Sequence, residues 1–228
     1  MAKPRNTILT SALLVSMAVF YGPALLAQTP PTIFDIANAP IPIQVLVQSP
    51  ADTETDMQVI CLFRSSAVNT MHGSLTEMNE KLKGLLDRIR KPDLFRGELG
   101  ETLLIAPPQG SLGARKLLII GLGNSQTFSP KQMQMVGEIL YAEAARLGVA
   151  HPYFAPTILD GGVTKFTTGE VAEQVIAGFL RAAATDKALR DASASPSQPV
   201  ATLTYLAGAM NAAGTRDGIE KAITTSRK

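Results

Sequence analysis

The stretch RKLLIIGLGNSQTFSP, residues 115–130, decides the fold that the sequence predicts. Its aliphatic run at 117–120 is typical of a strand that is buried on both faces of a sheet. Gly121 and Gly123 can turn the chain sharply out of that strand. Ser129, followed by a proline, can then cap a helix. A strand that leads directly into a capped helix is typical of an α/β fold.

The loop inside this stretch is also the candidate ligand site of the sequence. Its backbone amides and the start of the helix could face an anion such as a phosphate. The candidate residues are Gly121, Gly123, Asn124, Ser125 and Ser129. A dinucleotide fingerprint needs a third glycine three residues after the second, but Gln126 stands there. We therefore favour a structural glycine turn over a phosphate cradle.

Hydrophobic patterns on both sides of this unit predict further strands and helices in alternation. Strands are expected at 44–48 and 57–63, paired as a hairpin, at 102–106, buried on both faces, and at 200–206. Helices are expected at 74–90, 129–148, 167–184 and 217–225, with capping boxes at Ser74/Glu77, Ser129/Gln132 and Thr167/Glu170. The polar stretch 185–199 is expected to be a solvated loop. These elements predict an α/β fold, a mixed sheet flanked by helices.

The N-terminus predicts export. Lys3 and Arg5 precede an uncharged stretch at 8–26 that ends near small residues and a proline, which is the layout of a secretory signal peptide. Its densest apolar part is shorter than the about 20 residues of a membrane span. The expected parts are a signal peptide at 1–27, an N-terminal tether at 28–43 and a folded domain at 44–228. We expect a periplasmic or secreted product without a stable membrane anchor after cleavage.

Charge and cysteine content exclude several function classes. The chain has 21 basic and 19 acidic residues, and loss of the signal peptide would remove Lys3 and Arg5 but no acidic residue. The resulting neutral chain gives no reason to expect a nucleic-acid partner. Cys61 is the only cysteine, so an intramolecular disulfide is excluded. Its apolar neighbours indicate a buried core residue.

The sequence shows no recognisable catalytic or metal-binding pattern. The two histidines, His72 and His151, are far apart and form no zinc-ligand spacing. Asp52, Glu54 and Asp56 alternate in an acidic segment that we interpret as a solvated turn. No serine lies in a Gly-x-Ser-x-Gly elbow. We predict no catalytic residue, no metal ligand and no cofactor.

Several phrases, taken in their order, resemble the N-terminal domain of the leucyl aminopeptidase family. The phrases are FRGELGETLLI, ARKLLIIGLG, GEVAEQVIAGFLRAA and GIEKAITTSR. In that family a Phe-x-Gly-x-x-Gly phrase leads into a strand, a Gly-Leu-Gly turn closes the next strand, and a later helix carries Ala-Gly-Phe-Leu-like residues. The matching residues are Phe95, Gly97, Gly100, Gly121, Leu122, Gly123, Ala177, Gly178, Phe179 and Leu180. The resemblance covers roughly residues 44–227.

The resemblance implies a macro-domain-like three-layer sandwich. In full-length relatives this domain precedes a two-metal catalytic domain with the hallmark phrase Asn-Thr-Asp-Ala-Glu-Gly-Arg-Leu, which does not occur in this sequence. We therefore expect a non-catalytic exported module that binds a partner, itself or a small ligand. One alternative is the non-catalytic half of a split metallo-aminopeptidase, with a catalytic subunit as its partner. The other is a macro-domain-type binder of nucleotides or ADP-ribose.

A second fragment, Asn211-Ala212-Ala213, follows the last expected strand and also resembles a macro-domain phrase. It lacks the run of glycines that would wrap a diphosphate. We interpret this fragment as a coincidence.

Overall fold

The computed structural model describes residues 32–65, 70–90 and 94–227. The expected signal peptide at 1–27 lies outside these residues and stays a prediction. No helix in the described ranges has both the length and the apolar character that crossing a membrane would need.

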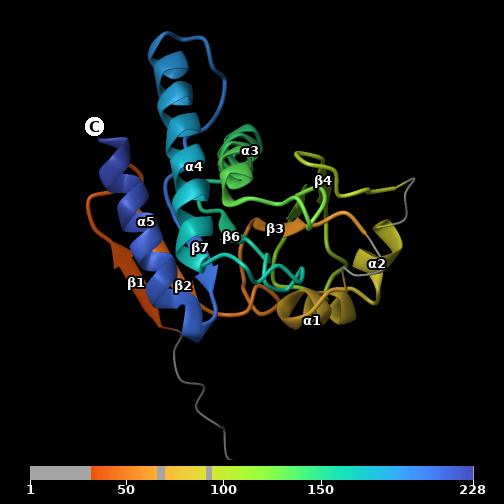
Figure 1. Ribbon diagram of the computed structural model, residues 1–228. Helices are drawn as coiled ribbons and strands as arrows, with labels where there is room; N and C mark the ends of the chain where they lie inside the picture. Colours follow the sequence, from red (N-terminus) through yellow and green to blue (C-terminus); the bar gives the residue numbers. More distant parts are fainter. Residues whose placement is uncertain (1–31, 66–69, 91–93, 228) are drawn as a thin grey trace, which may run out of the picture. The chain divides into compact units, whose positions relative to one another are not determined.

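A mixed sheet of seven strands forms the centre of the domain, in the order β1-β2-β7-β6-β3-β5-β4 (Figure 1). The strands are β1 (Ile33–Ile36), β2 (Ile43–Val47), β3 (Gln58–Leu62), β4 (Thr102–Ile105), β5 (Leu117–Gly121), β6 (Tyr153–Ala155) and β7 (Leu203–Ala207). The five inner strands run parallel, and the edge strands β1 and β4 are antiparallel to their neighbours. The predicted mixed sheet is therefore confirmed.

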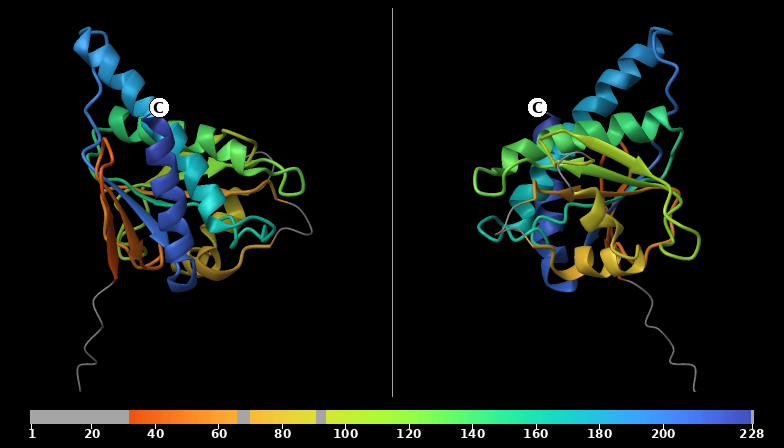
Figure 2. Two further views of the ribbon diagram at one scale, coloured as in Figure 1. Left: turned by 60° about the vertical axis from the view of Figure 1, so that its left-hand side comes forward. Right: turned by 90° about the vertical axis from the view of Figure 1, so that its right-hand side faces the viewer.

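Helices cover both faces of this sheet (Figure 2). They are α1 (Gly73–Lys81), α2 (Leu85–Ile89), α3 (Met133–Arg146), α4 (Thr168–Asp191) and α5 (Ala212–Ser226), with 3-10 turns η1 (Pro130–Gln132) and η2 (Ala209–Asn211). Val59 and Cys61 of β3 pack with α3, α4 and α5, whereas Ile60 and Leu62 pack with α1 and α2. Alternate side chains of one strand thus enter two cores, and the three-layer sandwich is confirmed.

Burial on both faces explains why the inner strands are almost wholly apolar. Every residue of β3, β5 and β7 is buried. A fully buried aliphatic side chain contributes about 1.5–3 kcal/mol relative to an exposed one. Cys61 is 1% exposed, as expected. Burial raises the pKa of its thiol well above the usual range, so Cys61 acts as a small apolar core residue.

Three strand predictions are wrong. The expected tether at 28–43 contains a strand, β1, whose four residues pair with β2 in the register Ile33↔Leu46 to Ile36↔Ile43. The expected hairpin does not form, because β7 and β6 lie between β2 and β3 in the sheet. Strand β4 is an edge strand with alternate residues exposed rather than a strand buried on both faces. In each case the local pattern of residues does not say which strand will be the neighbour.

Two of the three predicted capping boxes are confirmed. Ser129 caps η1 and Thr167 caps α4, each with its partner three residues later. The box at Ser74 and Glu77 is wrong, because α1 begins at Gly73. Both side chains instead bind residues from other parts of the chain, so tertiary contacts outweigh the local cap.

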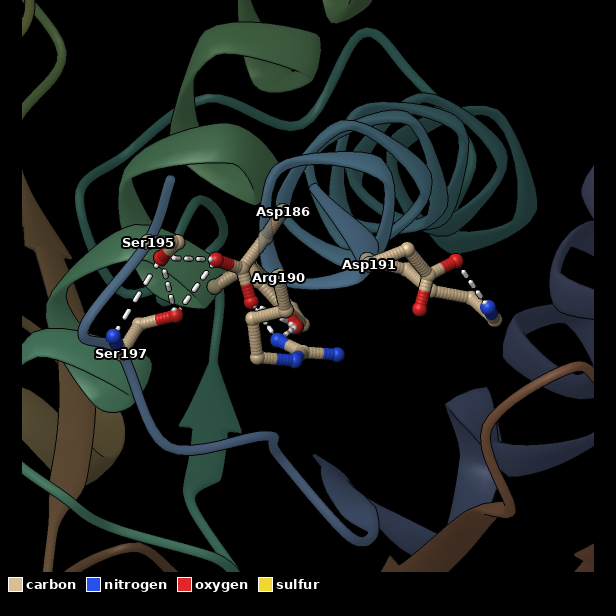
Figure 3. A network of polar contacts seen from close by, with 7 residues as sticks. Asp186, Arg190, Asp191, Ser195 and Ser197 are labelled. Atoms are coloured by element: carbon tan, nitrogen blue, oxygen red, sulfur yellow. Dashed lines mark hydrogen bonds and ion pairs between the residues drawn. The ribbon is translucent and has the colours of Figure 1, made fainter. Parts of the chain in front are cut away.

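Helix α4 is longer than predicted, and the carboxylate of Asp186 explains why (Figure 3). Asp186 accepts hydrogen bonds from the Tyr141 hydroxyl at 2.9 Å and the Ser195 hydroxyl at 2.9 Å, and also from the Ser197 hydroxyl. It also forms an ion pair with Arg190, and its side chain is only 14% exposed. The polar stretch expected as a loop therefore extends the helix to Asp191 and then folds back on it.

Candidate functional site

A cavity of about 570 Å³ lies at the carboxyl ends of three parallel strands, β2, β6 and β7. Its walls come from residues 47–50 after β2, the first turn of α1, residues 155–160 after β6, the start of α4, and residues 205–211. In open α/β sheets ligands bind at the carboxyl ends of the strands. The volume also lies in the range of about 300–1,000 Å³ typical of small-molecule sites.

A second cavity, of about 590 Å³, lies between α3 and the end of α4. The Asp186 carboxylate described above is its central polar group, and that carboxylate already binds four side chains. The cavity at the strand ends is therefore the better candidate for a ligand site.

Asp160 and α1 form one wall of the candidate site. The Ser74 hydroxyl donates a hydrogen bond to the Asp160 carboxylate, and the His72 amide donates to the Asp160 carbonyl at 2.8 Å. A Cβ atom on Gly73 would lie 2.6 Å from Oδ1 of Asp160, so only glycine lets the carboxylate approach this closely. A negative charge is favourable at a helix N-terminus. No lysine or arginine in the described ranges forms an ion pair with Asp160.

Glu77, one turn further along α1, has a different environment. Its Oε2 accepts a hydrogen bond from the Ser49 hydroxyl at 2.8 Å. Its Oε1 lies 3.9 Å from Nζ of Lys81, which also binds Asp52 at 2.6 Å. The charge of Glu77 is therefore partly balanced from outside the cavity, whereas no cation of the described ranges balances that of Asp160.

Thr157 connects the site to β3. Its hydroxyl donates to the Cys61 carbonyl at 2.6 Å and accepts from the Cys61 amide at 3.0 Å. These bonds continue the pairing of β3 beyond the end of β6. Thr157 has a φ of 50°, a conformation that is unusual for a β-branched residue. Such strain persists only where surrounding contacts hold it in place, and it is common near binding sites.

Tyr205 of β7 also lines the cavity. Its side chain is 1% exposed, and its hydroxyl has no hydrogen-bond partner among the described residues. Burial raises the pKa of the phenol well above its usual range, and Cys61 adds to the shift. The phenol is therefore a neutral hydrogen-bond donor at physiological pH. The hydroxyl itself has no accessible surface and lies close to Cys61, so it is a polar group of the core behind the cavity wall.

None of the five residues proposed from the sequence lines this cavity; these are Gly121, Gly123, Asn124, Ser125 and Ser129. Several amides of the glycine loop donate hydrogen bonds within the protein. Gly123 N donates to Gly97 O at 2.8 Å, Gln126 N to Asn124 Oδ1 at 2.9 Å, and Ser129 N to Gln132 Oε1 at 2.7 Å. These hydrogen bonds fit a structural turn, and a ligand role of the five residues stays a prediction.

Sequence reasoning missed the residues that the structure brings together at the cavity; among them are Ser74, Thr157, Asp160, Tyr205 and Asn211. Asn211 lies in the fragment that we interpreted as a coincidence, and the structure places it in the cavity wall. The sequence did offer one indication, because most of these residues lie in segments that follow a predicted strand. Which of those segments meet at one site could not be predicted without the order of the strands in the sheet.

Among the described residues, the site holds neither a metal-binding cluster nor a serine–histidine pair. Within the described residues, no group of three or more His, Cys, Asp and Glu side chains is placed to hold a metal ion. The His72 ring contacts the Thr70 hydroxyl at 2.9 Å, and the Ser74 hydroxyl binds a carboxylate instead of a histidine. The arrangement can bind a molecule through hydrogen bonds and charge.

Comparisons with known proteins agree with this fold. A probable cytosol aminopeptidase of Burkholderia mallei (strain SAVP1) is 33% identical over 78 residues, which are 34% of this chain and 15% of that protein. A variant of tomato leucine aminopeptidase has a TM-score of 0.59 at 20% identity, over 82% of this chain and 36% of that chain. The Oceanobacillus iheyensis macrodomain with ADP has a TM-score of 0.56 at 14% identity, over 86% of this chain and 100% of that chain.

The chain thus matches only a small part of its aminopeptidase relative. The model of the N-terminal domain of the cytosol aminopeptidase family matches residues 59–193, more than half of the chain. This match confirms the resemblance found in the sequence, and the chain belongs to the cytosol aminopeptidase family through its N-terminal domain.

Proposed function

We propose that the protein is a non-catalytic binding module whose cavity at the strand ends takes a small ligand. The observation that carries this proposal is the cavity itself, which gathers donors and acceptors from five parts of the chain at the ligand-binding edge of the sheet. The macrodomain similar in fold has ADP bound, which supports a small-molecule role for this architecture. Binding of a catalytic subunit and self-association stay predictions.

Blocking the cavity tests this function. Gly208 lines the cavity with φ −69° and ψ 154°, a backbone conformation that any residue adopts. A Cβ atom there would have only Asn211 Nδ2 within 4 Å, at 3.8 Å. The variant Gly208→Phe should therefore fill the cavity mouth with little effect on folding. Ligand-observed NMR with a fragment library should show fragments that bind the wild type and lose binding in the variant.

The matched control is Ala201→Phe, an exposed position at the opposite end of β7, which should keep fragment binding. Fragments that bind both variants equally, or a library without any binder, would contradict the proposed site.

The wild type should also leave leucine amide intact in the presence of Zn²⁺ or Mn²⁺. Metal-dependent hydrolysis that survives repurification would contradict the non-catalytic role.

We also propose that the protein is exported with loss of its first 27 or so residues, on the layout of its N-terminus. The intact mass of the protein, purified from its native host, should correspond to a chain that begins near residue 28. A mass that includes Met1 or Ala2 would show that the signal peptide prediction is wrong.

A further inference from the structure

We propose that this cavity, if it is the ligand site proposed above, selects a small ligand with a protonated amine and an apolar body, and disfavours ligands that carry phosphate. Three observations lead to this inference: the charge of the cavity wall, the state of the N-terminus of α1, and the character of the remaining walls.

The charge of the wall is negative. The charged side chains among the described lining residues are Glu77 and Asp160, and no described lysine, arginine or histidine lines the cavity. Lys81 partly balances Glu77 from outside, while among the described side chains Asp160 binds the Ser74 hydroxyl and no cation. A half-buried carboxylate attracts a cation and repels a phosphate more strongly than it would in bulk water.

The N-terminus of α1 is already occupied by an anion. Helix N-termini are common phosphate sites because their amides and dipole favour negative charge. Here the Asp160 carboxylate lies against the first turn, in contact with Ser74 and directly over Gly73. The protein thus supplies its own anion, and a phosphate would have to displace it. The outer side of the same carboxylate can accept hydrogen bonds from a ligand amine.

The remaining walls suit an apolar body. Val47, Ile158, Phe166, Val171 and Leu206 line the cavity. A carboxylate for an amine and apolar walls fit a small apolar amine better than a nucleoside diphosphate.

Calorimetric titration with matched probes tests the inference. The probes are leucine amide, 4-methylpentanamide, which lacks only the amine, and ADP-ribose. At a pH of about 6.5 the amine is protonated, because an α-amino group has a pKa of about 7.7–8.0. Leucine amide should bind the wild type at least about tenfold more tightly than 4-methylpentanamide, because its hydrogen bond to the carboxylate is charge-assisted. ADP-ribose should show no binding at millimolar concentration.

Two variants assign the effect to Asp160. Asp160→Asn keeps an acceptor for Ser74 but removes the charge, so leucine amide should bind about tenfold or more weakly while 4-methylpentanamide is little changed. Asp35→Asn removes an exposed carboxylate of β1 that does not line the cavity, and it should bind leucine amide like the wild type. Gly208→Phe should abolish binding of leucine amide, which would place that ligand in the cavity.

The outcomes separate this inference from the proposed function. If ADP-ribose or 4-methylpentanamide binds as tightly as leucine amide and Gly208→Phe abolishes that binding, the cavity is a ligand site but the preference for an amine is wrong. Equal affinities of wild type and Asp160→Asn for leucine amide would also overturn the inference. If neither these probes nor the fragment library bind in a way that depends on Gly208, both proposals fail.

Discussion

Replacement of Gly178 by alanine is expected to destabilise the protein by about 3 kcal/mol or more, the upper range for overpacking of a core. The direction of this change in the free energy of unfolding is informative, because alanine normally stabilises a helix by about 1 kcal/mol relative to glycine. A Cβ atom on Gly178 of α4 would lie within 3.0 Å of the backbone oxygen of Gln134, in the first turn of α3. Gly137 of α3 faces the backbone of Val175 in the same way.

The two helices α3 and α4 therefore touch through their backbones, and neither helix has a flexible side chain at this contact that can move aside. A methyl group at this contact must push α3 and α4 apart, which opens the core between them. Urea unfolding of Gly178→Ala and the wild type measures the cost. Gly214→Ala in α5 is the control, because its nearest neighbour is the Thr168 hydroxyl at 3.3 Å, a group that can rotate. A Gly178→Ala protein as stable as the control would contradict the proposed backbone contact.

Gly121→Ala is expected to destabilise the protein more than Gly123→Ala, although both belong to the same Gly-Leu-Gly turn. A Cβ atom on Gly121 would lie within 3.0 Å of the backbone oxygen of Glu98, so alanine must displace the neighbouring chain. We expect a cost of about 3 kcal/mol or more. Gly123 has a φ of 73°, but its Cβ atom would have no neighbour closer than 3.5 Å, the distance to Leu99. Its cost is that of a left-handed conformation, about 1–2 kcal/mol.

The same denaturation experiment on both variants measures this difference. Asparagine separates the two causes further, because it tolerates the left-handed conformation better than alanine does. Gly123→Asn should recover part of the stability that Gly123→Ala loses, whereas Gly121→Asn should be at least as unstable as Gly121→Ala. The reverse order of the two alanine variants would show that backbone conformation, rather than space, governs this turn.

The turn also shows which structural features can be predicted from residues that are neighbours in the sequence. The pattern around residues 115–130 correctly predicted a buried strand, a sharp glycine turn and a helix start capped by Ser129. These features depend on residues that are close in the chain: a run of aliphatic side chains, a hydroxyl three positions before an amide, and glycines without a Cβ atom. For the same reason the Thr167 cap of α4 and the burial of Cys61 were predicted correctly.

By itself, the sequence thus determined the α/β class and most helix starts, because these follow from local periodicity and capping. The family resemblance came from the order of its residue phrases. Only the tertiary structure decided that β7 and β6 separate β2 from β3, that 33–36 is a strand, and that Asp186 extends α4. It also decided the site, since Ser74 and Asp160 are 86 positions apart and meet only through the strand order. The physical reason is that a strand has two free edges and its residues specify burial, not neighbours. Which loops converge at the carboxyl ends of the strands is settled when long-range packing selects one order.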